Sequence, residues 1–164
     1  VGLGTGLNVL LTAMKSLFEA RVVNYTAIEK YPLTEQVINT LNYYKFAGKG
    51  AKDLFKKIHS CPWNVNVNIC KNFNFKKING DMVDYVIEGK YDLIYFDAFG
   101  PDKQPELWTD DIFKKISAAT AQNGILVTYS VKGEVKRSLR KNGFNVSRLP
   151  GPPGKRHILR AVKI

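Results

Sequence analysis

The chain opens with the stretch VGLGTGLN (Val1–Asn8), in which every second residue from Gly2 to Gly6 is glycine. Glycine lets a backbone turn tightly and approach a ligand closely. Apolar residues recur at helical spacing from Leu7 to Phe18, so this glycine-rich loop runs directly into a predicted helix. The start of that helix directs N–H groups and a positive dipole end toward such a ligand. A glycine-rich turn also serves close packing in many α/β proteins, so the loop alone leaves both interpretations open.

Segments typical of strands and helices alternate along the whole chain. Predicted strands cover residues 22–29, 91–97, 125–129, 144–149 and 157–163, and predicted helices cover 7–18, 108–119 and 133–142, with further helical positions after Pro32. The alternation between Val65 and Phe75 predicts one or two half-exposed strands, or a hairpin, ending near Gly80. The stretch YDLIYFD (Tyr91–Asp97) is typical of a buried parallel strand. This order predicts an α/β fold with a doubly wound, mostly parallel sheet.

The length of 164 residues suits a single domain over residues 1–164 with one core. In a doubly wound sheet, the strand before the first glycine loop is central, and its neighbours need it as a pairing partner. We therefore expect a first strand to precede Val1, which means that the chain begins partway into its domain.

Cysteine content and hydropathy limit the class of protein further. Cys61 and Cys70 are too few for a disulfide framework and form no CxxC or His/Cys cluster, which predicts reduced thiols, no bound metal and a cytoplasmic location. The absence of a long apolar run predicts that the protein is soluble and not inserted in a membrane. His59 and His157 are isolated in the sequence, so we expect structural or solvent-facing roles for them.

The chain is strongly basic, with 25 Lys and Arg against 14 Asp and Glu and a formal net charge of +11. Between Val131 and Ile164, ten basic residues face a single acid, Glu134. A second cluster is offset only by Asp53 and consists of Lys45, Lys49, Lys52, Lys56 and Lys57. A solvated surface explains scattered lysines, but concentration in one terminal segment favours a polyanionic partner such as nucleic acid.

Three predicted strand regions in succession end in a carboxylate: Glu29, Asp81 and Asp97. Ligands of doubly wound folds bind at the carboxyl edge of the sheet, and an acid after the second strand can accept hydrogen bonds from both ribose hydroxyls. The GxGxG spacing of the loop, in place of GxGxxG, argues against a dinucleotide. The pattern predicts a nucleoside-containing ligand at this edge.

The most distinctive stretch is FDAFGPDKQPELWT, from Phe96 to Thr109. Its prolines and glycine fix an irregular loop, while Phe99 and Trp108 offer flat apolar surfaces and Lys103 adds a cation. Such a loop shapes a pocket, although Trp108 also fits a core position beneath the next helix.

Six stretches carry a resemblance to a known family: VGLGTGLN, IEKYP, INGD, YFDAFGPDKQPELWT, TYSVKGEVKRSLRKNGF and PGPPGKRHILRA. Together they resemble the S-adenosylmethionine-dependent methyltransferase domain of the MnmC-like family, the tRNA 5-methylaminomethyl-2-thiouridine methyltransferases. The resemblance covers nearly the whole chain, and its most particular blocks are FDAF…P…PELW and PGPPGKR. It implies a Rossmann-like methyltransferase fold whose last strand is antiparallel.

The resemblance implies methyl transfer from S-adenosylmethionine to the aminomethyl nitrogen of a modified wobble uridine, with the tRNA bound by its anticodon arm. Cofactor contacts are implied for Gly2, Gly4, Gly6, Asn8, Glu29, Asp81 and Asp97. The glycines would face the methionine part, Glu29 the ribose and Asp81 the adenine amino group. Asp97 would stand beside the transferred methyl group. The acid that usually precedes the glycines by two positions would fall before Val1.

Asp97 is also the candidate catalytic residue, because a carboxylate can accept the proton of an alkylamine and orient its nitrogen. Candidate substrate-binding residues are Phe99, Lys103, Pro105, Trp108, Lys132, Lys155 and Arg156. The aromatic residues and the proline would stack on the flipped uracil, and the basic residues would contact phosphates.

Two other functions share this pattern. An aminopropyltransferase resembling spermidine synthase has a similar acid-rich loop, but its cationic substrates would be repelled by a surface of +11. A non-catalytic RNA-binding module on the same fold would have no need of Gly4, Glu29, Asp81 and Asp97. Some members of the resembled family carry a fused flavin-dependent oxidase domain. Nothing in these residues corresponds to it, which favours a stand-alone form.

Overall fold

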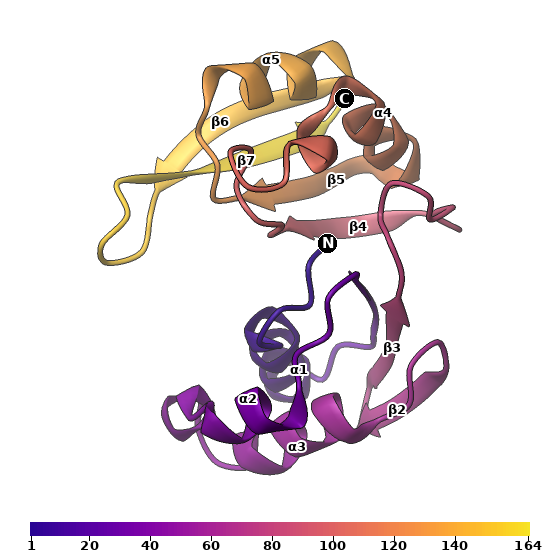
Figure 1. The fold of residues 1–164 in the computed structure, drawn as a ribbon, viewed down its shortest axis with the longest axis vertical. Coiled ribbons are helices and arrows are strands. Elements are labelled where there is room, and N and C mark those ends of the chain that lie inside the picture. The colour runs from indigo at the N-terminus through magenta and orange to yellow at the C-terminus, as the bar shows by residue number, and fades with distance from the viewer. The chain divides into compact units, whose positions relative to one another are not determined.

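A computed structural model describes residues 1–164 as two compact units (Figure 1). One unit is Gly2–Asp81, and the other comprises Val1 together with Met82–Ile164. Each unit has its own sheet and its own helices. The single domain expected from the chain length stays a prediction, as does a strand before Val1.

The first unit, Gly2–Asp81, contains a three-stranded sheet in the order β1-β3-β2. Its elements are α1 (Leu7–Glu19), β1 (Val23–Glu29), α2 (Glu35–Thr40), the 3-10 helix η1 (Tyr43–Phe46), α3 (Ala51–Ser60), β2 (Asn66–Cys70) and β3 (Phe73–Asn79). Strands β1 and β3 are parallel, with Glu29 opposite Asn79 at their carboxyl ends. Strand β2 is antiparallel to β3, which confirms the expected hairpin.

The helical region after Pro32 is divided into α2, η1 and α3. Gly48 and Gly50 have φ values of 99° and 84°, a backbone conformation that residues with a side chain rarely adopt. They separate η1 from α3 and set the start of α3, which Gly50 caps. Helical spacing in the sequence continues across this turn and therefore does not reveal it.

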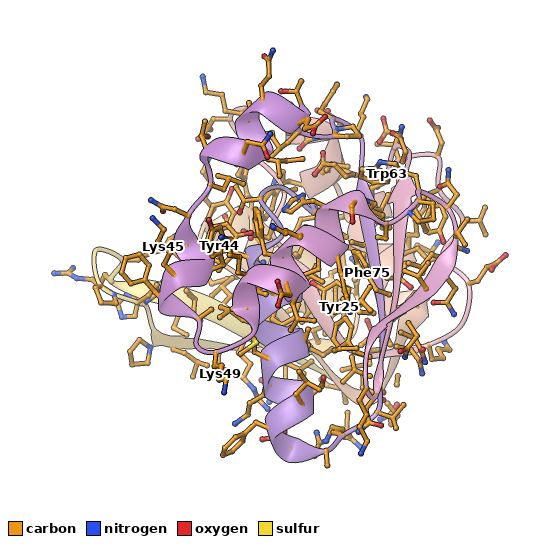
Figure 2. All side chains as sticks on the ribbon, turned by 90° about the horizontal axis from the view of Figure 1, so that it is seen from below. Tyr25, Tyr44, Lys45, Lys49, Trp63 and Phe75 are labelled. Atoms are coloured by element: carbon orange, nitrogen blue, oxygen red, sulfur yellow. The ribbon has the colours of Figure 1, made fainter.

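The core of the first unit is aromatic at its centre. Phe73 and Phe75 are fully buried on β3, and Tyr25 of the neighbouring β1 packs against both, with ring centroids 5.9 and 6.0 Å away. Figure 2 shows Tyr25 and Phe75 side by side in the interior of this unit. Burying such rings supplies most of the apolar stabilisation available to a small sheet.

Lys77 of β3 is a charged residue at a core position, with only 2% of its surface exposed. Its ammonium group donates hydrogen bonds to the carbonyl oxygens of Ile58 (3.1 Å) and His59 (2.6 Å), at the C-terminal end of α3. It also lies 4.7 Å from the centre of the Trp63 ring. Burial lowers the pKa of this lysine. Helix C-terminal carbonyls and an aromatic face compensate a buried cation, so Lys77 connects β3 to α3.

The second unit contains a four-stranded sheet in the order β4-β5-β7-β6. Its elements are β4 (Tyr91–Phe96), the 3-10 helix η2 (Pro105–Trp108), α4 (Asp110–Ala119), β5 (Thr120–Thr128), α5 (Gly133–Lys141), β6 (Phe144–Pro150) and β7 (His157–Lys163). Strands β4 and β5 are parallel, and β7 is antiparallel to both of its neighbours. The last strand is therefore antiparallel, as expected. Helix α5 lies along β6 (Figure 1).

Strand β4 is less buried than its apolar sequence predicts. Phe96 is fully buried, but Leu93 is 42% exposed. Within this sheet, β4 pairs with β5. The core of this unit lies farther in, where Phe96 and Phe113 pack with ring centroids 5.4 Å apart.

No helix of the chain combines the length and the apolar character needed to cross a membrane. Both cysteines, Cys61 and Cys70, are free thiols. No group of three or more His, Cys, Asp or Glu side chains is placed to hold a metal ion.

Candidate functional site

The glycine-rich loop of the first unit has the backbone conformation that its sequence predicts. Gly2, Gly4 and Gly6 all have positive φ values, of 81°, 51° and 78°. Gly2 N–H donates to the carbonyl oxygen of Ile28 in β1 (3.0 Å), and Gly6 N–H closes a turn onto Leu3 (2.9 Å). A side chain at Gly4 would meet no atom within 4 Å. The backbone at Gly4 therefore lies next to open space, where a ligand can approach it.

Glu29, the last residue of β1, connects that strand to the loop. Its Oε2 accepts a hydrogen bond from Gly4 N–H (3.0 Å), and its Oε1 accepts one from Tyr31 N–H (2.9 Å). A carboxylate offers about four acceptor positions, so two backbone bonds leave acceptor capacity for a ligand. Asn8 lies near the loop in sequence, half-buried in the first turn of α1.

Two side chains from distant parts of the sequence fix the carbonyl oxygen of Thr5 in the same loop. Tyr43 Oη donates a hydrogen bond to it, and His59 Nε2 lies 3.1 Å from it. Burial raises the pKa of Tyr43 to about 12, so its hydroxyl remains a donor throughout the neutral range. Burial also lowers the pKa of His59, whose ring packs on Phe55. These contacts join residues 38 and 54 positions apart, and no local sequence pattern predicts them.

Asp81 lies just beyond β3, at the same end of the sheet as Glu29. Its Oδ2 forms an ion pair with Lys30 Nζ at 2.7 Å, and this hydrogen bond raises the pKa of Lys30. Gly80 N–H donates to the carbonyl oxygen of Glu29 (3.0 Å), which joins the ends of β3 and β1. The first unit therefore brings the glycine loop, Glu29 and Asp81 to one end of its sheet. The role of Lys30 was not foreseen.

Asp97 follows β4 directly in the second unit and is exposed. Its backbone N–H donates to the carbonyl oxygen of Val1 (3.0 Å), and the backbone nitrogen of Val1 donates to the carbonyl oxygen of Tyr95 (2.7 Å). Tyr129 Oη donates to the carbonyl oxygen of the next residue, Ala98 (2.8 Å). Burial and the nearby charge of Asp97 raise the pKa of Tyr129. The backbone on both sides of the Asp97 side chain is therefore fixed.

Phe99 and Trp108 have different environments, although both were expected to offer a surface for stacking. Trp108 is buried, with its ring 4.9 Å from that of Phe96 in an edge-on arrangement, and its Nε1–H donates to the carbonyl oxygen of Phe99 (2.8 Å). Trp108 therefore occupies a core position, which was the alternative interpretation of this residue in the sequence. Phe99 is 67% exposed. Trp108 therefore holds the loop, and Phe99 presents the free ring.

The tail residue Lys155 reaches the region of Asp97 through Tyr129. Its ammonium group lies 4.0 Å from the centre of the Tyr129 ring. Arg156 is exposed beside it, and its carbonyl oxygen accepts a hydrogen bond from Gly151 N–H (3.2 Å). The loop between β6 and β7 therefore contributes a cation close to the loop that follows β4.

The remaining substrate candidates lie on or against the loop after β4. Lys103 and Pro105 are exposed. Lys132 forms an ion pair with Asp102 at 2.6 Å, and this bond raises the pKa of the lysine. Lys132 is thus partly neutralised within the protein.

A cluster of like charges lies on α5 and β6. Desolvation and the charges of Arg148, Arg140 and Arg137 lower the pKa of Lys136, so these three arginines lie close enough to Lys136 to repel its charge. By contrast, Lys141 at the end of α5 is paired with Asp110. The structure places five of the ten basic residues of this terminal segment on α5 and β6: Lys136, Arg137, Arg140, Lys141 and Arg148.

Comparison with known proteins gives a family for most of the chain. Residues 47–164 match a family model described as S-adenosyl-L-methionine-dependent methyltransferase. Among solved structures, MnmC2 from Aquifex aeolicus superposes with a TM-score of 0.74 at 29% identity, covering 98% of this chain and 50% of that one. A methyltransferase from Pyrococcus furiosus matches with a TM-score of 0.58 at 16% identity, over 99% and 72% of the two chains. These structures confirm the α/β methyltransferase fold.

Two bacterial proteins are similar to this chain over nearly all of its length. It is 32% identical over 164 residues to the tRNA 5-methylaminomethyl-2-thiouridine biosynthesis bifunctional protein MnmC of Campylobacter hominis. That match covers 98% of this chain and 24% of the relative. The protein of the same name from Actinobacillus pleuropneumoniae is 30% identical over 179 residues, covering 96% and 26%. The chain thus spans about a quarter of the length of these relatives.

Proposed function

Because the chain belongs to the family of S-adenosyl-L-methionine-dependent methyltransferases, we propose that it methylates the aminomethyl nitrogen of a modified wobble uridine in tRNA. The names of the two relatives support this substrate. The observation that carries the proposal is the loop after β4, where the side chains of Asp97 and Phe99 are both exposed. Tyr129 and Trp108 hold this loop by donating hydrogen bonds to the backbone carbonyl oxygens of Ala98 and Phe99. The family match also favours methyl transfer over aminopropyl transfer.

The first unit fits the cofactor of this family. The backbone at Gly4 borders open space, and the Glu29 carboxylate is held at the adjoining strand end with acceptor capacity left. In the proposal, the glycine loop and Asn8 hold the methionine part, Glu29 the ribose hydroxyls and Asp81 the adenine amino group. When bound, S-adenosylmethionine supplies a methyl group activated by a positively charged sulfur.

The hydrogen bond from Tyr43 to Thr5 gives a prediction about this loop. In Tyr43→Phe, the Thr5 carbonyl loses one of its two side-chain partners, so the loop is less well positioned. One hydrogen bond contributes about 0.5 to 1.5 kcal/mol, so the affinity for S-adenosylmethionine should fall roughly 2- to 10-fold. Calorimetry measures the affinity, and kinetics should show a higher KM with kcat preserved.

The matched control is Tyr44→Phe. Tyr44 is the next residue of η1 and also packs on Phe55, but its hydroxyl does not contact the loop. If both variants bind the cofactor equally well, the contact with Thr5 does not position the loop.

Asp97 is the proposed proton acceptor. An alkylamine is largely protonated near neutral pH, and only the neutral form has a lone pair for attack on the methyl carbon. The Asp97 carboxylate would accept the amine proton, directly or through a water, and orient the nitrogen. Its backbone, fixed by Val1 and Tyr129, makes it a positioned base. Holding two reactants in line can supply much of the rate enhancement.

Phe99 is the proposed stacking partner of the target uracil. Unpaired bases of RNA loops are commonly recognised by stacking on aromatic side chains. Lys155 and Arg156 would contact phosphates of the anticodon arm near that base, and Lys103 and Pro105 would line the approach. Trp108 would act indirectly, by holding the Phe99 carbonyl.

The cluster of cations on α5 and β6 supports a polyanionic substrate, because phosphates relieve the repulsion within it. In the variant with Lys136 and Arg140 of this cluster and Lys155 of the loop between β6 and β7 all changed to glutamine, tRNA should bind more weakly. The slope of log affinity against log salt should flatten by about 0.7 to 0.9 for each phosphate that the variant no longer neutralises. Filter binding at several salt concentrations measures the affinity for tRNA and its dependence on salt. Lys114→Gln, at an exposed lysine on α4, is the control. If the triple variant has the same affinity for tRNA and the same salt slope as this control, the cluster is a solvated surface that does not contact RNA.

The proposal as a whole is tested with labelled S-adenosylmethionine and tRNA from cells that lack this methylation. Label should appear in the wobble nucleoside after digestion and chromatography, and fully modified tRNA should accept none. Label in another nucleoside, or in none, contradicts the proposed substrate.

A further inference from the structure

The second lysine cluster of the sequence, in the first unit, has no role in the function proposed above. All five of its lysines are exposed, and none has a carboxylate within ion-pair distance. The ammonium group of Lys57 donates a hydrogen bond to the carbonyl oxygen of Ile69 (3.3 Å), which leaves Lys45, Lys49, Lys52 and Lys56 for a ligand. Other lysines of this unit are paired, such as Lys15 with Glu19 and Lys30 with Asp81. The positive charge of this segment is therefore not compensated within the protein.

The local fold directs these lysines outward. Lys52 and Lys56 are four residues apart on α3 and share one face of the helix, while Leu54 and Ile58 are buried on the other. Lys45 lies in η1, and Lys49 lies in the turn between η1 and α3. Figure 2 shows Lys45 and Lys49 projecting outward from this segment.

Phe46 lies between Lys45 and Lys49 in the sequence and is 86% exposed. The two residues of η1 that begin the helix, Tyr43 and Tyr44, pack on Phe55 with ring centroids 5.4 and 5.1 Å away. They anchor η1 on α3 and leave the ring of Phe46 outside the core. A solvated aromatic ring between unpaired ammonium groups is the combination that binds single-stranded nucleic acid, where bases stack and phosphates are neutralised.

We propose that residues 45–56 form an RNA-contacting surface, in which Phe46 stacks on an unpaired base and the lysines contact the neighbouring phosphates. This inference rests on the proposed function, in which the substrate is tRNA. The surface is built on the same short helix whose first residue, Tyr43, bonds to Thr5 of the glycine loop. RNA held here is therefore bound by the unit that carries the cofactor loop.

Charge and exposure alone also suit an anionic membrane, but the chemistry of the segment favours RNA. Phe18 of α1 is equally exposed, at 86%, but it shares its helix with exposed Leu11 and Leu17, and its neighbour Lys15 is paired with Glu19. Phe46 instead stands alone between unpaired lysines. Isolated rings between cations suit separate bases along a phosphate chain.

The test compares Phe46→Ala with Phe18→Ala in the full chain, by affinity for the substrate tRNA. Loss of one base stack should weaken tRNA binding roughly 5- to 100-fold in Phe46→Ala, with an unchanged salt slope and unchanged affinity for S-adenosylmethionine. Phe18→Ala should bind as the wild type does. Both changes are at exposed positions, and thermal melting verifies the fold.

The charges are tested separately with Lys45→Gln combined with Lys49→Gln. The salt slope of tRNA binding should fall by about 1.4, at about 0.7 per phosphate contact of a single strand. Lys71→Gln combined with Lys114→Gln, two exposed lysines outside the segment, is the control and should leave the slope unchanged.

Three outcomes overturn the inference. The first is that Phe46→Ala binds tRNA as tightly as Phe18→Ala does. The second is that the Lys45/Lys49 and Lys71/Lys114 double variants have equal salt slopes of tRNA binding. The third is that the Phe46 and Lys45/Lys49 variants bind tRNA normally but no longer bind vesicles of phosphatidylcholine with phosphatidylserine. Methyl transfer with an unchanged KM for tRNA in Phe46→Ala overturns the surface and leaves the proposed function standing. If tRNA binding depends on Phe46 but no methyl group reaches the wobble nucleoside, the proposed function is overturned and the RNA-contacting surface stands.

Discussion

Replacing Asp97 with asparagine is expected to lower the rate of methyl transfer about 100-fold or more, with little change in affinity for S-adenosylmethionine. Asparagine keeps the shape of the side chain but loses the charge and the proton acceptor. A positioned base contributes about 100- to 10,000-fold, which sets the magnitude. Single-turnover measurements on labelled tRNA give the rate without interference from product release.

The dependence of this deficit on pH identifies the role of Asp97. If the carboxylate accepts the amine proton, the deficit should shrink as pH rises, because more substrate amine is already neutral. A deficit independent of pH points to orientation or electrostatic stabilisation instead. Asp92→Asn, at an exposed position on the same strand, is the matched control and should keep near wild-type turnover. Near wild-type turnover in Asp97→Asn would assign the base to another residue.

Replacing Glu29 with alanine is expected to weaken S-adenosylmethionine binding roughly 5- to 150-fold. Deleting the carboxylate leaves the ribose hydroxyls without an acceptor, at a cost of about 1 to 3 kcal/mol. The structure adds a second cause, because Gly4 N–H and Tyr31 N–H lose their acceptor in the same variant. Calorimetry with the cofactor and with its demethylated product measures the loss.

Glu29→Gln separates these two causes. The glutamine carbonyl oxygen can still accept the bond from Gly4, while its amide group can accept neither Tyr31 N–H nor a ribose hydroxyl. We expect an affinity between those of the wild type and Glu29→Ala. Glu35→Ala, at an exposed acid in the first turn of α2, controls for loss of charge. Equal affinities for the wild type and Glu29→Ala would remove Glu29 from the cofactor site.

Local sequence patterns predict much of this fold. Alternation of apolar and polar residues marks the hairpin of β2 and β3, and the stretch rich in strand-forming residues from Ile125 to Tyr129 marks the second half of β5. These signals are local, since each depends on residues within one strand or one helical turn. The exposure of Leu93 was not predictable in this way, because the burial of a side chain depends on tertiary packing.

In the candidate site too, some residues could be predicted from local sequence patterns and others could not. Glu29, Asp81 and Asp97 were identified because each follows a recognisable strand. Tyr43 and His59 were not, because their contacts with Thr5 depend on how α3 and η1 pack beside the loop. Trp108 left two interpretations open, since burial of a ring is a property of tertiary structure.

The two tryptophans of the chain have a practical consequence. Trp63 belongs to the first unit, with a lysine ammonium 4.7 Å from its ring, and Trp108 belongs to the second, buried with its Nε1–H bonded to a carbonyl oxygen. Each unit therefore contains its own intrinsic fluorophore. With Trp63→Phe or Trp108→Phe, the emission of the remaining indole follows the unfolding of one unit without an added dye. Coincident transitions in the two variants would identify a single cooperative domain.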